Sequence, residues 1–289
     1  MLLQVLTMHK IIALDLDGTL LNSNKELTPR NLAALKSAAD AGILIVPTTG
    51  RFYGGMPEEI RQLPFIKYAI TINGAQVSDV CSGEVIYKAE IPCYEAIGIM
   101  EFLDDYPVIY DCYQHNDAWM TKKLKERIDE IVSGVHYRKM LHELRKPVED
   151  LKQVLRERNC GVQKVQFFTN KPEVRTYLME ELLKRFENLC VTSSTDDNVE
   201  INQMHANKGE ALLALGEHLG IKREEIISFG DGYNDLSMLK AAGVGVAMAN
   251  ACEAAKKAAD RITLSCDEDG VAAFIEEILS EVNDYEYTF

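Results

Sequence analysis

The chain has 289 residues, of which 47% are hydrophobic and 26% are charged, as in an ordinary globular protein. Its formal net charge of −14 argues against non-specific binding to nucleic acid or to an acidic membrane surface, because both are negatively charged as well. No apolar run approaches the roughly 20 residues that a membrane-spanning helix requires. We therefore expect neither a nucleic-acid nor a membrane partner, whereas a small anionic ligand in a local cationic pocket is compatible with this charge.

The seven cysteines are scattered along the chain and form no C-x-x-C pair. This usage is typical of reduced thiols and predicts a cytoplasmic location. The start of the chain, MLLQVLTMHK, is too short to be a secretory signal. For the oligomeric state, a monomer is the default expectation and a dimer is the alternative.

The first predicted elements alternate between strand and helix. A buried strand is predicted at Lys10–Leu14, where an apolar run ends on an aspartate. A helix follows, with Thr28 as N-cap, Pro29 at the first helical position and Gly42 as the stop signal. Two more strands are predicted at 43–47 and 68–72. This order indicates a parallel sheet with crossover helices, the α/β class.

The pattern changes after the third strand. Asn73-Gly74 and Ser82-Gly83 are turn signals that predict hairpins. Residues 85–194 then have a mixed character, which we interpret as an inserted α+β domain between two parts of one core, residues 1–84 and 195–289. The helices predicted in this insert are 94–104, 121–132, 148–157 and 172–186, and the strands are 108–112, 162–168 and 189–193.

The α/β pattern returns near the end of the chain. A helix is predicted after Asn207 as N-cap, and a strand is predicted to end on Asp231. A short helix closed by Gly243, a strand at 244–248 and a helix at 270–279 follow. The chain therefore resumes the parallel sheet that it began before the insert.

Four polar segments stand at predicted strand ends or helix starts, the edge where open α/β sheets bind ligands. Two of them are rich in carboxylates, Asp15–Thr19 and Gly230–Asp235. The other two, Thr48–Arg51 and Asn207–Gly209, offer hydroxyl, amide and cationic donors suited to an anion.

The carboxylates need compensation, because like charges repel one another and are costly to remove from water. A magnesium ion shared by Asp15, Asp17 and Asp231 would supply it, since Mg²⁺ prefers hard oxygen ligands and substrate phosphate. A carboxylate nucleophile, a metal, a lysine and a hydroxyl together predict a phosphoryl-transfer centre. Calcium-loop, Walker A and dinucleotide-binding patterns do not fit these positions.

The four segments, DLDGTLL, TTGR, NKG and GDGYNDLSML, resemble the four ordered motifs of the haloacid dehalogenase-like (HAD) superfamily, and in detail its Cof-type sugar-phosphatase branch. The resemblance covers both core parts. It implies a Rossmann-like parallel-sheet core, with the insert as a mobile α+β cap domain of type two, subclass B.

The resemblance also implies the roles of the reacting residues. Asp15 would attack phosphorus and form an aspartyl-phosphate, and Asp17 would serve as general acid and then as general base. Magnesium would be held by the Asp15 carboxylate, by Asp231 and by the backbone carbonyl of Asp17, which leaves the Asp17 carboxyl free. For this chemistry the metal and Lys208 should lower the pKa of Asp15, and the surroundings of Asp17 should raise the pKa of Asp17.

The remaining motif residues would bind the substrate or support the site. Arg51 would reach toward the substrate, and Asp235 would orient Lys208 or a metal-bound water. The residues implied to hold the phosphate are Leu16 and Gly50 through their amides, Thr49, Lys208 and Asn234.

The predicted function is a Mg²⁺-dependent phosphatase that hydrolyses a small phosphorylated metabolite, such as a sugar phosphate. Two alternatives stay open. The first is a phosphomutase acting on a sugar phosphate, and the second is a non-catalytic protein that binds phosphorylated metabolites. The sequence identifies neither the substrate nor the cap residues that select it.

Overall fold

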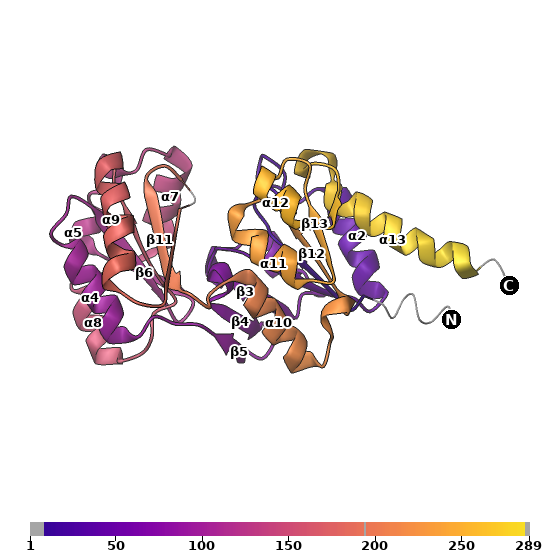
Figure 1. Ribbon diagram of the computed structural model, residues 1–289, viewed down its shortest axis with the longest axis horizontal. Helices are drawn as coiled ribbons and strands as arrows, with labels where there is room; N and C mark the ends of the chain where they lie inside the picture. Colours follow the sequence, from indigo (N-terminus) through magenta and orange to yellow (C-terminus); the bar gives the residue numbers. More distant parts are fainter. Residues whose placement is uncertain (1–8, 194, 287–289) are drawn as a thin grey trace. The chain divides into compact units, whose positions relative to one another are not determined.

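The structure is a computed structural model that describes residues 9–193 and 195–286 (Figure 1). Its described residues form two compact units. The first unit contains the chain up to Arg51, residues 56–88 and the chain from Asn207 onward. The second contains Phe52–Gly55 and Ala89–Ala206.

The first unit is built around a five-stranded parallel sheet in the order β14-β13-β12-β1-β2. An antiparallel sheet, β3-β4-β5, continues beside β2, where Thr48 forms a parallel bridge with Ile70. The strands are β1 Ile11–Leu14, β2 Leu44–Pro47, β3 Tyr68–Thr71, β4 Gln76–Asp79, β5 Val85–Lys88, β12 Ile226–Gly230, β13 Val244–Ala247 and β14 Arg261–Ile262. The helices are α2 Pro29–Asp40, α3 Glu58–Arg61, α10 Lys208–Leu219, α11 Leu236–Ala241, α12 Glu253–Ala258 and α13 Gly270–Glu286.

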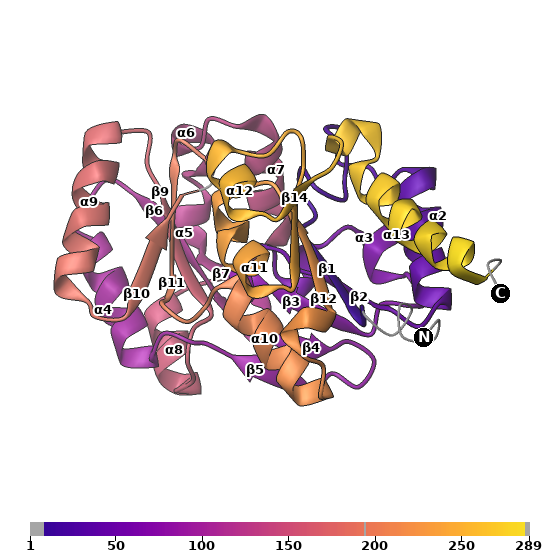
Figure 2. The ribbon, with the colours of Figure 1, turned by 45° about the vertical axis from the view of Figure 1, so that its right-hand side comes forward.

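Helices cover both faces of the parallel sheet, which is why its strands are apolar on both sides. On one face, α10 and α11 pack on the strands through buried residues such as Leu212 and Met238. On the other face α2 and α13 lie side by side, as Figures 1 and 2 show, and the Phe274 ring of α13 meets the Phe229 ring of β12 edge-on. The α/β fold class is confirmed.

The second unit has a six-stranded sheet in the order β10-β11-β9-β6-β7-β8, antiparallel except for the β7–β8 pair. Helices α4, α8 and α9 pack on one face in a large apolar cluster, and α6 and α7 cover part of the other face. The strands are β6 Ile109–Gln114, β7 Asp117–Thr121, β8 Arg145–Val148, β9 Lys164–Phe168, β10 Leu189–Thr192 and β11 Asn198–Gln203. The helices are α4 Cys93–Leu103, α5 Lys122–Lys125, α6 Ile128–Ile131, α7 Val135–Leu144, α8 Leu151–Arg158 and α9 Pro172–Arg185.

The boundaries of the two units differ from the predicted 84/85 and 194/195. Strand β5 belongs to the first unit because it pairs with β4, and β11 belongs to the second because it pairs with β9 and β10. The segment Phe52–Gly55 also joins the second unit, because the Phe52 ring packs edge-on against Tyr113.

Other differences concern single elements. The helix predicted at 121–132 is interrupted, because Arg127 has non-helical backbone angles (φ −95°, ψ 2°) between α5 and α6. Strands β7, β8 and β11 and helices α7 and α12 were not predicted from the sequence. The caps at Thr28 and Asn207 are confirmed, since each side chain accepts a hydrogen bond from an amide in the first turn.

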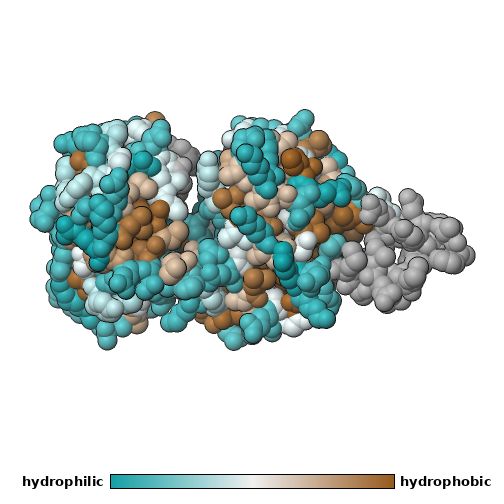
Figure 3. Space-filling model, viewed as in Figure 1, coloured by the Kyte–Doolittle hydropathy of each residue, from teal (hydrophilic) through white to brown (hydrophobic). Residues whose placement is uncertain are grey.

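Within the described residues, none of the helices combines the length and the apolar character needed to cross a bilayer. The face of the molecule in Figure 3 is mostly hydrophilic, with apolar patches set among hydrophilic residues.

Candidate active site

The carboxyl ends of three neighbouring strands bring the predicted motifs together. Leu14, the last residue of β1, lies in register with Phe229 of β12 on one side and with Pro47 of β2 on the other. Asp15 and Thr48 are therefore the next residues at the same edge, and the turn that contains Asp231 follows the end of β12.

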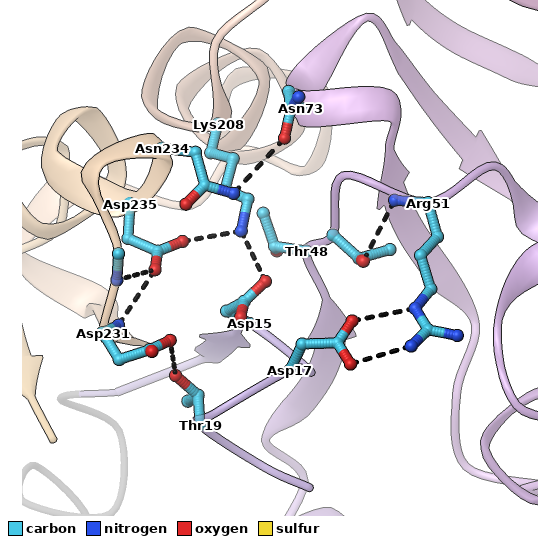
Figure 4. Close-up of polar contacts among 12 residues, drawn as sticks. Asp15, Asp17, Thr19, Thr48, Arg51, Asn73, Lys208, Asp231, Asn234 and Asp235 are labelled. Carbon is cyan, nitrogen blue, oxygen red and sulfur yellow. Dashed lines mark hydrogen bonds and ion pairs between the residues drawn. The ribbon is translucent and has the colours of Figure 1, made fainter. Parts of the chain in front are cut away.

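Lys208 is the centre of the site. Its ammonium group lies 2.6 Å from Asp15 Oδ1 and 2.6 Å from Asp235 Oδ1, and its side chain is fully buried (Figure 4). The residue is held there by α10, whose first turn is capped by Asn207. A buried cation between two carboxylates partly balances their charge. This contact between Asp235 and Lys208 is the one that the family resemblance implied.

A third carboxylate completes the cluster. Asp231 Oδ1 accepts a hydrogen bond from the Thr19 hydroxyl (3.0 Å), and Asp235 Oδ2 accepts from the amides of Asp231 (2.9 Å) and Gly232 (2.8 Å). Oxygen atoms of Asp15, Asp231 and Asp235 lie within 4.8 Å of one another. Three converging carboxylates facing one lysine have excess negative charge, and hard oxygen donors of this kind fit Mg²⁺.

Burial dominates the proton affinity of these carboxylates. It raises the pKa of Asp15 to about 8; the nearby Lys208 opposes this shift, while the charges of Asp235 and Asp231 add to it. Burial and the charge of Asp235 likewise raise the pKa of Asp231 to about 6. Lys208 lowers the pKa of Asp15 as predicted, but in the protein chain by itself desolvation and two like charges outweigh this one lysine.

Asp17 is held in the opposite way. The Arg51 guanidinium donates to both of its carboxylate oxygens, at 2.8 Å and 2.7 Å (Figure 4). Lys25 Nζ lies 3.1 Å from Asp17 Oδ1. Burial by itself would raise the pKa of Asp17, but Arg51 and Lys25 outweigh it and hold the pKa below its usual range. The expected rise is therefore wrong in this arrangement. The Asp17 carboxylate faces cations and lies outside the acidic cluster.

Three of the predicted phosphate-binding residues, Thr49, Gly50 and Asn234, lie next to Asn73. The sequence analysis interpreted Asn73 only as part of a turn. Asn73 Oδ1 accepts a hydrogen bond from Asn234 Nδ2 (3.3 Å), and its amide donates to the Thr49 carbonyl (3.0 Å). A side chain at Gly50 would collide with Asn73 Oδ1, at 2.7 Å from a Cβ atom. Leu16 is buried between the two aspartates, with its carbonyl bonded to the Leu21 amide.

Three residues of the site were thus missed. Thr19 stands inside the DLDGTLL segment, and its hydroxyl could have been paired with an aspartate on chemical grounds. Asn73 directly follows a predicted strand, and a polar residue at the carboxyl end of a strand could have been recognised as a candidate site residue. Lys25 gave no signal, because a tight turn with positive φ (66°) brings it back to Asp17.

Gly74 sets how closely the β3–β4 turn approaches Lys208. It has φ +95°, and a Cβ atom there would lie 2.3 Å from the Asn207 carbonyl oxygen. We expect Gly74→Ala to lower the free energy of unfolding by about 3 kcal/mol or more. The added methyl group would clash with main-chain atoms, and relieving the clash would require the backbone of one segment to move. Gly83→Ala is the matched control: Gly83 also has positive φ (78°) but no atom within 4 Å, so only about 1 kcal/mol is expected. Urea denaturation measures both, and equal losses would contradict the close approach.

Comparison with known proteins agrees with this geometry. A sequence profile of haloacid dehalogenase-like hydrolases matches residues 12–275. Phosphatase YwpJ of Bacillus subtilis is 32% identical over 287 residues, which cover 93% of this chain and 100% of that protein. The 5-amino-6-(5-phospho-D-ribitylamino)uracil phosphatase YcsE of B. subtilis is 31% identical over 92% of this chain and 94% of its own. A solved sugar phosphatase of HAD subclass IIB superposes with a TM-score of 0.76 at 27% identity, covering 93% of this chain and 98% of the other.

Proposed function

Because this chain belongs to the haloacid dehalogenase-like hydrolases and its relatives are phosphatases, we propose that it is a Mg²⁺-dependent phosphatase that hydrolyses a small sugar or polyol phosphate through an aspartyl-phosphate. The observation that carries the proposal is the convergence of Asp15, Asp231 and Asp235 on the buried Lys208. The second unit would be the cap of this site.

In the first step an Asp15 carboxylate oxygen forms a bond to phosphorus while the bond from phosphorus to the alcohol oxygen breaks. Asp17 gives its proton to the departing alkoxide, which leaves as the alcohol. In the second step a water oxygen attacks phosphorus, Asp17 takes the water proton, and the bond to Asp15 breaks. Before the first step Asp17 must therefore exchange its contacts with Arg51 and Lys25 for a proton. Substrate phosphate is a natural competitor for both cations.

The phosphate oxygens would be bound by Lys208, by Thr49 and Asn234, and by the amides of Leu16 and Gly50. Mg²⁺, when bound by Asp15 and Asp231 with the Asp17 carbonyl, would neutralise phosphate charge and the excess charge of the carboxylates. Asp235 would keep Lys208 and the 231–232 turn in place through the contacts described above.

Removal of Mg²⁺ is expected to make stability depend on pH. The pKa values of Asp15 (about 8) and Asp231 (about 6) lie above their ordinary value of 3.8, so between about pH 4 and pH 8 the folded state binds more protons than the unfolded state. Stability then falls as the pH rises through this window. With a chelator, the melting temperature should be lower at pH 8 than at pH 6. Saturating Mg²⁺ should raise the melting temperature more at pH 8 than at pH 6. If calorimetry showed an equal rise in melting temperature at both pH values, the metal assignment would be contradicted.

A panel of phosphate esters incubated with Mg²⁺ tests the function through the release of inorganic phosphate. The panel would contain hexose, pentose and polyol phosphates, pyridoxal phosphate and an aryl phosphate. We expect release to be fastest with polyol or sugar esters. Isomerisation of a hexose phosphate without release of phosphate would instead establish a mutase, and binding of an ester without turnover would establish a non-catalytic binding protein.

A further inference from the structure

Two cysteines of the second unit stand beside an isolated β-bridge, one on each of its two segments. In the bridge, the backbones of Ile91 and Val162 exchange both hydrogen bonds, each at 2.8 Å, in an antiparallel arrangement. Cys93 lies two residues after Ile91, and Cys160 lies two residues before Val162. Positions related in this way are opposite each other in an antiparallel pair, and their side chains point to the same side. Pro92 has extended backbone angles (φ −54°, ψ 144°), so the chain stays extended from the bridge to Cys93.

The thiol contacts place both sulfur atoms at the same end of a helix. Cys93 Sγ donates to the Leu155 carbonyl oxygen at 3.2 Å, and Cys160 Sγ donates to the Arg158 carbonyl oxygen at 3.1 Å. Leu155 and Arg158 belong to the last turn of α8, where three residues span about 4.5 Å along the helix axis. The position of the sulfur atoms thus agrees with the register of the bridge, and both cysteines belong to the same compact unit.

The two thiols also influence each other electrostatically. Burial raises the pKa of Cys93, and the nearby Cys160 adds to this rise, as expected for neighbouring groups that both become negative. Both side chains are partly exposed, whereas Cys112, another neighbour of Cys93, is fully buried in β6. Cys81 is exposed but belongs to the first unit. Within residues 9–193 and 195–286, neither thiol of the pair belongs to a group of three side chains with metal-binding geometry. The chemistry that the arrangement favours is therefore a reaction of one thiol with the other.

We propose that Cys93 and Cys160 form a redox-active thiol pair, which a low-molecular-weight disulfide such as oxidised glutathione converts into an intramolecular disulfide. The reduced thiols predicted from the sequence are then the resting state of the pair, and the disulfide is its state under oxidising conditions. This inference goes beyond the proposed function and does not rest on it, because it concerns the second unit alone.

The disulfide forms by two exchange reactions. The Cys160 thiolate attacks one sulfur of the low-molecular-weight disulfide, forms a mixed disulfide and releases one small thiolate. The Cys93 thiolate then attacks the Cys160 sulfur, and the second small thiolate leaves. Two electrons pass from the cysteines to the small disulfide, and the two cysteine protons pass to the two thiolates released. Cys160 reacts first because the raised pKa of Cys93 keeps more of that thiol protonated.

The disulfide would tie the start of α4 to the segment that leads into the sheet of the second unit. The chain re-enters this unit at Ala89, Cys93 is the first residue of α4, and Cys160 lies shortly before β9. The bond closes a loop that contains β6, β7 and β8, and closing a loop reduces the conformational freedom of the unfolded chain. Oxidation should therefore raise the melting temperature of the second unit by roughly 5–10 °C.

Peptide mapping tests the pair. The whole chain is equilibrated with a series of mixtures of reduced and oxidised glutathione, the remaining thiols are alkylated, and the peptides are identified by mass spectrometry. In the unmodified protein, two of the seven thiols should disappear together, with the peptides of Cys93 and Cys160 joined. Dithiothreitol should separate the two peptides again and reverse the rise in melting temperature.

Serine variants show whether the two thiols act on each other. Cys93→Ser and Cys160→Ser each remove one sulfur and keep a hydrogen-bond donor, and thermal melting shows whether they are folded. In Cys93→Ser, glutathione should remain on Cys160 roughly tenfold more abundantly than in the unmodified protein, because no second thiol displaces it. Cys81→Ser is the matched control, since it removes an exposed thiol of the first unit. It should leave the joined peptides and the melting temperature unchanged.

Three results would overturn the proposal. The first is that Cys93 and Cys160 stay unlinked at every glutathione ratio, whether free or each carrying its own glutathione. The second is a link from Cys93 to Cys112, which would assign the reaction to a different partner. The third is a joined protein that melts at the temperature of the reduced one, which would refute the stabilising role. None of these results depends on the release of phosphate, so the test is separate from that of the proposed function.

Discussion

Replacement of Asp15 by asparagine is expected to reduce phosphate release by at least about a thousandfold, because an amide oxygen is a poor nucleophile toward phosphorus. The fold should persist. Since burial already raises the pKa of Asp15 to about 8, the neutral asparagine resembles the form that the folded chain favours near pH 7. The measurement is the rate of phosphate release with saturating Mg²⁺, together with the melting temperature.

Asp40→Asn is a suitable control for this variant. It removes the same charge from an exposed position at the end of α2, outside the four motifs. It should retain full activity. Rapid acid quenching should also trap one phosphoryl group on the unmodified protein, on the peptide that contains Asp15. An Asp15→Asn protein that is as active as the unmodified one would eliminate Asp15 as the nucleophile.

Lys208→Met should damage both activity and stability. It removes the cation that lies 2.6 Å from both Asp15 and Asp235, and it leaves two buried carboxylates facing each other. Losing one partner of a buried ion pair costs about 3–5 kcal/mol. The loss should grow as the pH rises, because the buried Asp15 carboxyl must then ionise without its cation. Phosphate release should fall by roughly a hundredfold or more, as a bound phosphate would lose a charged donor.

The double variant Lys208→Met, Asp235→Asn separates the two effects. Asparagine can still accept a hydrogen bond from the 231–232 amides through its oxygen, and it removes one unpaired charge. Urea denaturation should show that stability is partly restored, whereas activity should not recover. Lys240→Met, at an exposed position in α11, should alter neither quantity. If the double variant were no more stable than Lys208→Met, charge burial would not be the cause of the loss.

The sequence predicted the elements of the first unit well because their signals are local. The Thr28 cap, the apolar run before Asp15 and the turn at Asn73-Gly74 each stand within a few residues of the element they define. The second unit was less predictable. Its strand β8, with Arg145 buried at its start, carries polar residues where a strand pattern would have apolar ones. The reason is that Arg145 pairs with Asp111 of β6, a strand distant in the sequence.

For the site, the position of the motifs at strand ends and at a helix start, together with the family resemblance, was enough to predict that Asp15, Lys208 and Asp231 meet. The contact between Asn73 and Asn234 could not be predicted from the sequence. These residues are 161 positions apart, and nothing in the sequence around one of them indicates that it pairs with the other. The direction of the Asp17 pKa shift was predicted wrongly for the same reason, and the size of the desolvation effect at Asp15 was not predicted. Desolvation of Asp15 depends on everything packed around it, and the pairing of Asp17 with Lys25 depends on the turn that reverses the chain after Asn22.

The short segment Phe52–Gly55 gives the protein an additional tether. The chain leaves the first unit directly after Arg51, contributes four residues to the second unit and returns at Met56. The residue that follows Arg51 in the chain therefore belongs to the second unit, while the Arg51 guanidinium pairs with Asp17 in the first. The residue that pairs with Asp17, the proposed proton donor, is thus one peptide bond away from the unit that we propose as the cap.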